Sequence, residues 1–285
     1  MTAFSLLLPV YGRDDPAHLR RAFESAVQEQ TRRPDEVVVV QDGPVPDALA
    51  AELAALVGSS PVPARLVELP HNLGLAAALT AGLDACAHDV VARMDADDIA
   101  LPERFERQLA VIDEGFDLVG SGLLEFEDDE RVTIGVRTPP VGEERIHRYA
   151  RFHQPFNHPT VMYRRQAVRR AGGYVAEGLM EDYWLFARML VAGARVANLP
   201  EPLLKYRVGA GAYRRRGGWS QLGAELTLQR QLRGLGFTSR REALRNRVVR
   251  GGYRLLPEAV RKVSYRGLLQ RGFRRGRSGT EGGHR

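Results

Sequence analysis

Three carboxylates lie within four positions of the chain, at Asp95, Asp97 and Asp98, separated by two residues from the apolar residues 90–92. This pattern predicts a buried strand that ends in an acidic loop. Like charges so close together repel one another, and burying them costs several kcal/mol unless a cation compensates. A hard divalent ion such as Mg²⁺ or Mn²⁺ would do so, and it usually arrives with substrate phosphates. The alternative interpretation is a solvated acidic turn that caps the helix expected to begin near Pro102.

Strand and helix signals alternate along the first part of the chain. The four consecutive valines at residues 37–40 are typical of a fully buried strand. Such alternation predicts parallel strands joined by right-handed crossovers, and ligands of such sheets bind at the carboxyl ends of the strands, where the acidic loop falls. The expected strands cover residues 4–8, 36–41, 65–69 and 89–94, and the expected helices cover residues 16–30, 47–57, 75–87 and 102–114.

The pattern loosens after residue 114 and predicts a mixed sheet. A helix over residues 181–192 begins with two acids, which suits its dipole. Residues 208–218 carry four glycines and three arginines and are expected to form a mobile loop, with a mostly helical remainder. The other expected strands are 117–126, 131–137, 160–163, 195–199 and 203–207, with a helix over 142–151.

Charge divides the chain into an acidic body and a basic tail. Residues 1–204 hold 20 arginines, no lysine and 31 acids, a net charge of −11, whereas residues 205–285 hold 21 basic and 4 acidic side chains, a net charge of +17. No apolar run approaches the roughly 18 residues that span a bilayer, and the first ten residues lack the basic start of a signal peptide. A single cysteine, Cys86, permits no internal disulfide. These features predict a cytoplasmic location.

Several short segments together resemble family 2 glycosyltransferases, in the branch that makes bacterial polysaccharides and O-antigens. The resemblance implies the GT-A fold, which is a Rossmann-like α/β arrangement with a mixed, mainly parallel sheet flanked by helices. It places a glycosyltransferase domain at residues 1–207 and a basic, mainly helical extension at residues 208–285. The matching segments are residues 7–11, 40–43, 72–75, 93–98, 157–162 and 181–183.

The resemblance also implies a binding site for a nucleotide-sugar donor. Asp42 would accept the imide N–H of uracil or thymine, which favours a UDP- or dTDP-sugar, although an Asp before Gly43 also suits a simple turn. Pro9 and Tyr11 would line the base pocket, and Asn72 would border the nucleotide. Each of these three positions has an ordinary structural explanation as well.

Arg93 ends a buried strand and needs a partner, which is either the diphosphate or the aspartates Asp95 and Asp98. The family pattern assigns Asp95 to the ribose and the metal shell, and Asp97 to the metal as principal ligand. Asp98 is expected to cap the next helix. His158 is a further candidate ligand for Mn²⁺ or Mg²⁺, or for the diphosphate, and a hydrogen-bonded structural histidine is an equal alternative.

The last implied role is that of the general base. A sugar hydroxyl is a weak nucleophile until a carboxylate takes its proton. In the family the second acid of the Glu181–Asp182 pair does this, so the sequence predicts Asp182 as the catalytic base. The family often has an acid where this chain has Trp184, which affects the acceptor pocket rather than the base.

The predicted activity is inverting, metal-dependent transfer of one sugar to a hydroxyl of a glycan, on a lipid-linked acceptor. Single transfer is favoured because no Gln-x-x-Arg-Trp signature of processive synthases follows residue 200. Two alternatives are a sugar-1-phosphate nucleotidyltransferase and a nucleic-acid binder that uses the basic tail, although no specific nucleic-acid motif is present. Residues 219–271 either lie on an anionic membrane at the inner face of the cell, as the pattern over residues 257–269 indicates, or pack on the acidic body or in a homodimer.

Overall fold

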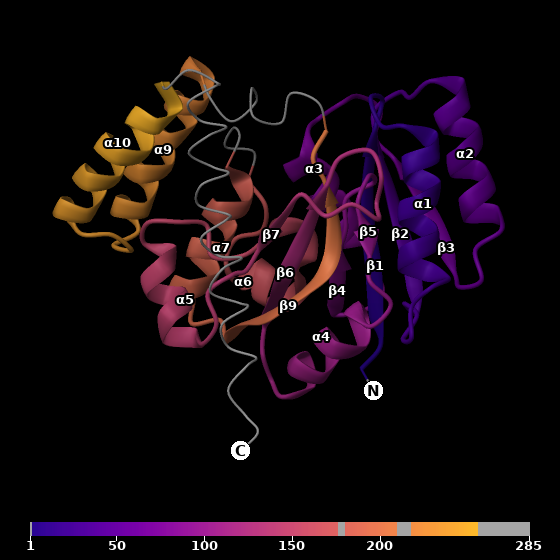
Figure 1. Ribbon diagram of the computed structural model, residues 1–285, viewed down its shortest axis with the longest axis horizontal. Coiled ribbons are helices and arrows are strands. Elements are labelled where there is room, and N and C mark those ends of the chain that lie inside the picture. Colours follow the sequence, from indigo (N-terminus) through magenta and orange to yellow (C-terminus); the bar gives the residue numbers. More distant parts are fainter. Residues whose placement is uncertain (1, 176–179, 210–217, 256–285) are drawn as a thin grey trace.

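The computed structural model describes residues 2–175, 180–209 and 218–255. Nine strands form its single sheet, and helices cover both faces (Figure 1). The strands are β1 (Phe4–Tyr11), β2 (Glu36–Asp42), β3 (Ala64–Glu68), β4 (Val90–Arg93), β5 (Ile99–Ala100), β6 (Leu118–Phe126), β7 (Gly135–Arg137), β8 (Met162–Arg164) and β9 (Val196–Arg207). Their order is β3-β2-β1-β4-β8-β6-β9-β5, and β7 pairs with β6.

The helices follow the strands closely in the first half of the chain and cluster in the second. They are α1 (Pro16–Val27), α2 (Asp47–Gly58), α3 (Leu75–Ala85), α4 (Arg104–Asp113), α5 (Glu143–Ala150), the 3-10 turn η1 (His158–Thr160), α6 (Arg165–Arg170), α7 (Glu181–Val191), α9 (Trp219–Gly234) and α10 (Arg240–Leu255).

The sheet is parallel in its first part and mixed in its second. β1 pairs in parallel with both β2 and β4, and β2 pairs in parallel with β3. The antiparallel strand β8 then joins β4 to β6, and β6 runs parallel to the long strand β9. This arrangement confirms the predicted α/β class with a mixed, mainly parallel sheet. It brings the carboxyl ends of β1, β2 and β4 to one edge.

Two apolar cores lie on opposite faces of the sheet because successive side chains of a strand point to opposite sides. In β1, Leu6 and Leu8 join the core under α1, α2 and α4, whereas Leu7 joins the core under α3, α7 and α9. Helix side chains close both cores: Leu19 of α1 and Phe186 of α7 are fully buried. The sheet is therefore held rigidly from both sides, which fixes the loops at its carboxyl edge.

The second half of the chain departs from the sequence predictions in detail. The two strands expected at 195–199 and 203–207 form one strand, β9, whose register with β6 shifts near Ser121 and Gly122. The strand expected at 131–137 is only three residues long, and that expected at 160–163 begins at Met162 after a 3-10 turn. Helix α4 begins at Arg104, so Pro102 precedes its first turn. Sequence patterns did not predict β5 or α6.

The helices α9 and α10 pack against each other and, through α9, against α7. Leu228 and Leu232 of α9 belong to the same buried cluster as Phe186 of α7. This bears out the packing interpretation for that part of the tail, while the division of the chain after residue 207 stays a prediction. The amphipathic segment expected at 257–269 and most of the loop expected at 208–218 lie outside the described residues.

Candidate active site

The acidic loop joins the end of β4 to the short strand β5. Arg93, the last residue of β4, is 1% exposed and donates two hydrogen bonds to the carboxylate of Asp95, one of them Nη1 to Oδ2 at 2.9 Å. Burial lowers the pKa of this guanidinium, but the neighbouring carboxylates, Asp95 first, outweigh that effect and raise it. The sequence left the partner of Arg93 open, and the structure gives it as Asp95.

Asp97 is half-buried, and its carboxylate is the most ligand-like of the loop. Burial, reinforced by the charge of Asp95, raises its pKa to about 6, while Arg207 acts in the opposite direction. Both oxygens of Asp95 already accept from Arg93 and Asp98 is fully buried, so Asp97 is the partly exposed loop carboxylate outside the ion pair. This arrangement suits the role of principal metal ligand that was predicted for Asp97.

Asp14, which follows β1, is a further acid near Asp95 and Asp97 and was missed by the sequence analysis. Its Oδ2 accepts the backbone N–H of Tyr11 at 2.9 Å. Burial raises its pKa to about 7, and the charges of Asp97 and Asp95 raise it further against the lowering effect of that hydrogen bond. The pairing of β1 with β4 brings Asp14 to the acidic loop. No local pattern in the sequence predicts that Asp14 lies there.

Asp98 does not cap the next helix, so this part of the prediction was wrong. Its side chain is fully buried, and Oδ1 accepts the backbone N–H of Arg207 at 2.9 Å. The side chain of Arg207 donates to the main-chain oxygens of Asp97 and Glu127, each at 3.1 Å. Asp98 and Arg207 therefore tie the acidic loop to the end of β9.

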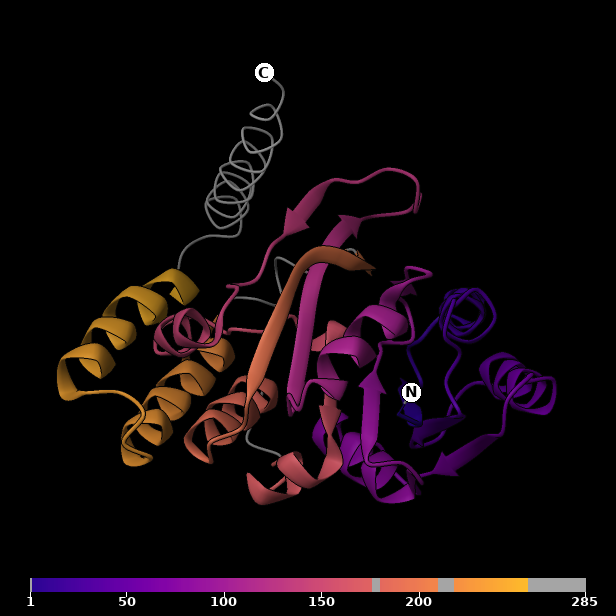
Figure 2. The same cartoon turned by 90° about the horizontal axis from the view of Figure 1, so that it is seen from below.

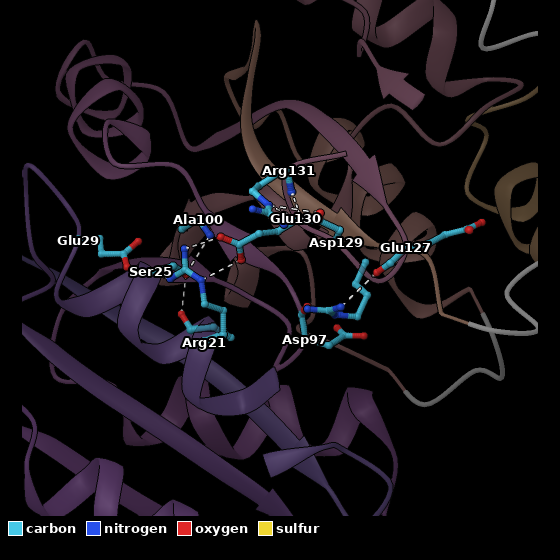
Figure 3. A network of polar contacts seen from close by, with 11 residues as sticks. Arg21, Ser25, Glu29, Asp97, Ala100, Glu127, Asp129, Glu130 and Arg131 are labelled. Carbon is cyan, nitrogen blue, oxygen red and sulfur yellow. Dashed lines mark hydrogen bonds and ion pairs between the residues drawn. The ribbon is translucent and has the colours of Figure 1, made fainter. Parts of the chain in front are cut away.

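A second set of ion pairs fixes the turn between β6 and β7 on α1. Figure 3 shows Arg21 pointing between Glu29 and Glu130. It also shows Asp97 and Glu127 close to each other in the neighbouring part of the same network. Arg21 Nε lies 2.9 Å from Glu130 Oε2. These contacts bring the 127–131 turn next to the acidic loop, so two segments far apart in sequence border the same site.

The residues predicted to bind the nucleotide lie at the carboxyl ends of β1 and β2. Asp42 is buried, and its two oxygens accept the backbone N–H groups of Leu73 and Gly74 at 2.7 and 2.9 Å. These bonds anchor the turn that holds Asn72, whose amide lies 3.4 Å from the main-chain oxygen of Asp42. Each carboxylate oxygen keeps a second lone pair for a ligand.

Close backbone approach is built into the same corner. Gly43 has a φ of +80°, and a Cβ there would lie 2.4 Å from the backbone nitrogen of Asn72. Pro9 is buried within β1, and Tyr11 at the strand end is 43% exposed. The structure thus gathers Pro9, Tyr11, Asp42 and Asn72 on neighbouring strand ends, as expected of one binding crevice, while their contacts with a nucleotide remain predictions.

The other acidic pair opens α7. Asp182 accepts a hydrogen bond from Gln154 Nε2 at 2.5 Å and another from the backbone N–H of Tyr183 at 2.7 Å. Burial raises the pKa of Asp182, and these two donors, helped by Arg93, oppose the rise. Burial also raises the pKa of Glu181 to about 7, with the charge of Asp182 adding to it. A raised carboxylate pKa suits a general base.

His158 lies beside Asp182 and packs in the interior. Its Nε2 is hydrogen-bonded to the Tyr174 hydroxyl at 2.9 Å, and its Nδ1 is 3.7 Å from Asp182 Oδ2. Burial first, and the positive charge of Arg93 second, lower its pKa well below the usual range, so the ring is neutral. The structure thus supports the alternative of a hydrogen-bonded histidine, and the predicted role of His158 as a metal or diphosphate ligand remains untested.

The two acidic centres share one electrostatic site, and Arg93 connects them. The guanidinium lowers the pKa of both Asp97 and Asp182, and Asp95 raises that of Glu181. Within residues 2–175, 180–209 and 218–255, no three acidic, histidine or cysteine side chains form a ready-made metal cluster. A divalent ion held by carboxylates of the acidic loop would therefore need further oxygen ligands from another molecule.

Comparison with known proteins decides the family. The family model described as glycosyl transferase family 2 matches residues 5–172. The chain belongs to this family. It is 39% identical over 262 residues to the amylovoran biosynthesis glycosyltransferase AmsE of Erwinia amylovora, which covers 92% of this chain and 97% of that relative. It is 32% identical over 272 residues to the UDP-Gal:alpha-D-GlcNAc-diphosphoundecaprenol beta-1,3-galactosyltransferase of Escherichia coli, over 94% of this chain and 97% of that relative.

Solved structures confirm the GT-A fold. The S. aureus TarS 1–349 structure in complex with UDP-GlcNAc matches 81% of this chain and 66% of its own at a TM-score of 0.63 and 17% identity. The mannosyltransferase PcManGT from Pyrobaculum calidifontis, in complex with GDP-Man and Mn²⁺, matches 92% of this chain and 74% of its own at 0.62 and 17%. The protein is a nucleotide-sugar-dependent glycosyltransferase related to enzymes of bacterial polysaccharide synthesis, which replaces the nucleotidyltransferase and nucleic-acid-binding alternatives.

Proposed function

We propose that this glycosyltransferase transfers one sugar, with inversion and with the help of a divalent ion, from a UDP- or dTDP-sugar to a glycan hydroxyl on a lipid-linked acceptor. The observation that carries the proposal is geometric: in the acidic loop Arg93 pairs with Asp95 and not with Asp97, whereas at α7 Gln154 and the Tyr183 N–H hold the carboxylate of Asp182. The carboxylates of the acidic loop suit a metal ion that accompanies a diphosphate. The carboxylate at the start of α7 suits the removal of a proton.

In the proposed reaction, the acceptor hydroxyl attacks the anomeric carbon from the side of α7. As the new C–O bond forms, Asp182 takes the hydroxyl proton, and the C–O bond to the diphosphate breaks on the opposite face. The nucleoside diphosphate leaves with the bonding electrons, so an α-linked donor gives a β-linked product. Gln154 and the Tyr183 N–H hold the Asp182 carboxylate in place during this step.

The acidic loop fits a hard divalent ion by its donor chemistry. Carboxylate oxygens are the ligands that Mg²⁺ and Mn²⁺ prefer. Burial, together with the charges of neighbouring aspartates, raises the pKa values of Asp97 and Asp14, so a bound cation would favour their charged forms. Asp97, with Asp95 beside it, would hold the ion, which when bound would neutralise charge on the departing diphosphate. Binding of Mn²⁺ by a fold relative supports this assignment.

The donor and the acceptor are inferred from chemistry and from relatives. A uracil or thymine ring can place its imide N–H on Asp42, with Pro9, Tyr11 and Asn72 around it. The E. coli relative named above uses UDP-Gal and a diphosphoundecaprenol acceptor, and TarS binds UDP-GlcNAc. A lipid-linked acceptor would place the enzyme in the cytoplasm at the inner membrane face. None of the helices within the described residues has the length and apolar character needed to cross a bilayer.

A donor screen tests the proposal. Purified full-length protein is incubated with Mn²⁺, a polyprenyl-diphosphate-linked sugar acceptor and a panel of UDP-, dTDP- and GDP-sugars, and the released nucleoside diphosphate is measured. We expect acceptor-dependent release from a UDP- or dTDP-sugar and a β-linked product by NMR. Release from GDP-sugars alone would overturn the role given to Asp42, and an α-linked product would overturn inversion.

A further inference from the structure

One face of the α9–α10 hairpin is fixed on the body by buried polar contacts. Glu225 of α9 is fully buried and lies 2.6 Å from Nε of Arg250 on α10. Arg250 also donates to the main-chain oxygen of Phe152, and the buried Asn246 donates to that of Arg151 at 2.8 Å. Since each buried group has a partner, this face of α10 is occupied by the protein itself.

The opposite face of α10 carries exposed aliphatic side chains. Leu244, Val248 and Leu255 are 63%, 66% and 50% exposed, and their spacing of four and seven residues places them on one side of the helix. Trp219, the first residue of α9, is 79% exposed. It lies beside the end of this stripe because the N–H of Gly218 donates to the main-chain oxygen of Arg254.

Exposed arginines flank this apolar stripe. They are Arg240, Arg241 and Arg247 on α10, whereas the guanidinium of Arg245 stacks on Phe152 of the body. The acid of this helix, Glu242, is engaged elsewhere: it accepts the backbone N–H of Ser239 at 2.8 Å and pairs with Arg151. Figure 1 and Figure 2 both place α10 at the outer edge of the molecule, away from the nucleotide-binding half. We name the stripe and its arginines the outer face of α10.

We propose that the outer face of α10 docks on an anionic lipid bilayer, with Trp219 at its margin. Aliphatic side chains and tryptophan gain by entering the interface between headgroups and acyl chains, and arginines beside them pair with anionic headgroups. Nucleic acid would pair with the arginines but would leave Leu244 and Val248 in water. The role of docking, which is to hold the enzyme near a lipid-linked acceptor, rests on the proposed function, whereas docking itself does not.

Co-sedimentation with vesicles tests the proposal on the full-length protein. Vesicles of phosphatidylcholine alone are compared with vesicles that contain phosphatidylglycerol, at low and high salt. We expect binding to the anionic vesicles at low salt and release at high salt. Each basic residue near such a surface contributes about 1 kcal/mol, so Arg241→Gln with Arg247→Gln should weaken binding about 30-fold.

Two further variants sharpen the test. Leu244→Gln with Val248→Gln should weaken binding by at least about 10-fold through the lost apolar contact. Arg33→Gln with Arg169→Gln, exposed positions on the N-terminal and α6 sides, removes the same charge and should bind normally. Donor turnover on a soluble acceptor should be unchanged in every variant, which separates failure of docking from failure of the proposed function.

Three results would overturn the proposal. The first is a wild-type protein that ignores anionic vesicles at low salt. The second is unchanged binding in both α10 variants, which would assign any membrane contact to another part of the chain. The third is a wild-type homodimer, seen by sedimentation velocity without lipid, that the Leu244→Gln, Val248→Gln variant converts to monomer, because the outer face would then be a contact between two copies.

Discussion

The acidic loop after β4 and the start of α7 each place adjacent acids at the end of a regular element, yet their surroundings differ. Asp182 of α7 receives two hydrogen bonds from the protein, from Gln154 and the Tyr183 N–H. In the acidic loop, Arg93 pairs with Asp95. Burial and the charge of Asp95 raise the pKa of Asp97 to about 6.

This contrast separates two uses of carboxylates. The α7 centre is already organised by its neighbours, as a general base must be to meet a proton at a defined position. The loop keeps negative charge in a half-buried place with Asp14 nearby, and such a centre gains most from an added cation. We therefore expect ligand-dependent behaviour from the loop and ligand-independent geometry from α7.

The largest effect is expected for the loop. Asp97→Ala should abolish donor turnover because it removes the carboxylate proposed to hold the ion. EDTA should abolish turnover by the wild-type protein because it removes the ion itself. Release of nucleoside diphosphate is the measurement, with Mn²⁺ and Mg²⁺ added back. Full turnover in EDTA would refute metal dependence. Asp84→Ala, at an exposed acid of α3 paired with Arg169, is the matched control and should keep normal turnover.

The base assignment predicts the next largest effect. Asp182→Asn is nearly isosteric but cannot take a proton, so the transfer rate should fall by about 10²- to 10⁴-fold. Glu181→Gln should cost less. Single-turnover transfer at saturating donor measures both. If Asp182→Asn kept a near-normal rate while Glu181→Gln lost it, the base would be Glu181.

Arg93 connects the two centres, and its loss should destabilise the fold. Breaking a buried ion pair by removing one partner typically costs about 3–5 kcal/mol, so Arg93→Gln should lower the free energy of unfolding by about 3 kcal/mol in a urea titration. The double variant Arg93→Gln, Asp95→Asn should recover part of this loss. A single variant as stable as the wild-type protein would show that Arg93 does not hold the site together.

The smallest effect concerns pH and sharpens the contrast. The pKa of Asp97 is about 6 in the folded chain and 3.8 as its ordinary value. The folded state is therefore penalised increasingly as pH rises through that window. Metal-free Asp97→Asn should melt higher than the wild-type protein at pH 8, on the order of 5 °C, and the gain should vanish toward pH 3. An unchanged melting temperature at pH 8 would mean that the charge of Asp97 does not destabilise the folded loop. Asp129→Asn, whose pKa is lowered to about 2 by Arg131, should show no gain.

Local patterns in the sequence predicted most of the first half of the fold and both acidic centres. Periodicity and runs of valine are local signals, so β1, β2 and α1 were recognised. Two strands were expected at 195–199 and 203–207, but β9 runs without a break through Pro200 and Pro202, and its register with β6 shifts near Gly122. The two-residue strand β5 is too short to leave a pattern.

The parts of the site that escaped prediction depend on contacts through space. Asp14 joins the acidic group only because β1 pairs with β4, with Leu7 opposite Arg93. Asp98 looks like a helix cap by its position, yet it holds the end of β9 through the Arg207 N–H. Gln154 is an amide in an irregular segment, and nothing in its surroundings announces its bond to Asp182. Resemblance to a family supplies roles for motif residues but not their supporting neighbours.

The division of labour between the two centres is tested most directly by calorimetric titration of UDP with Mn²⁺ into the wild-type protein and two variants. We predict that Asp182→Asn binds UDP–Mn²⁺ within about 3-fold of the wild-type affinity, because its carboxylate acts on the acceptor side. Asp97→Asn should bind at least about 10-fold more weakly, as expected on loss of a metal ligand. Equal affinity for both variants, or weaker binding by Asp182→Asn than by Asp97→Asn, would contradict this account.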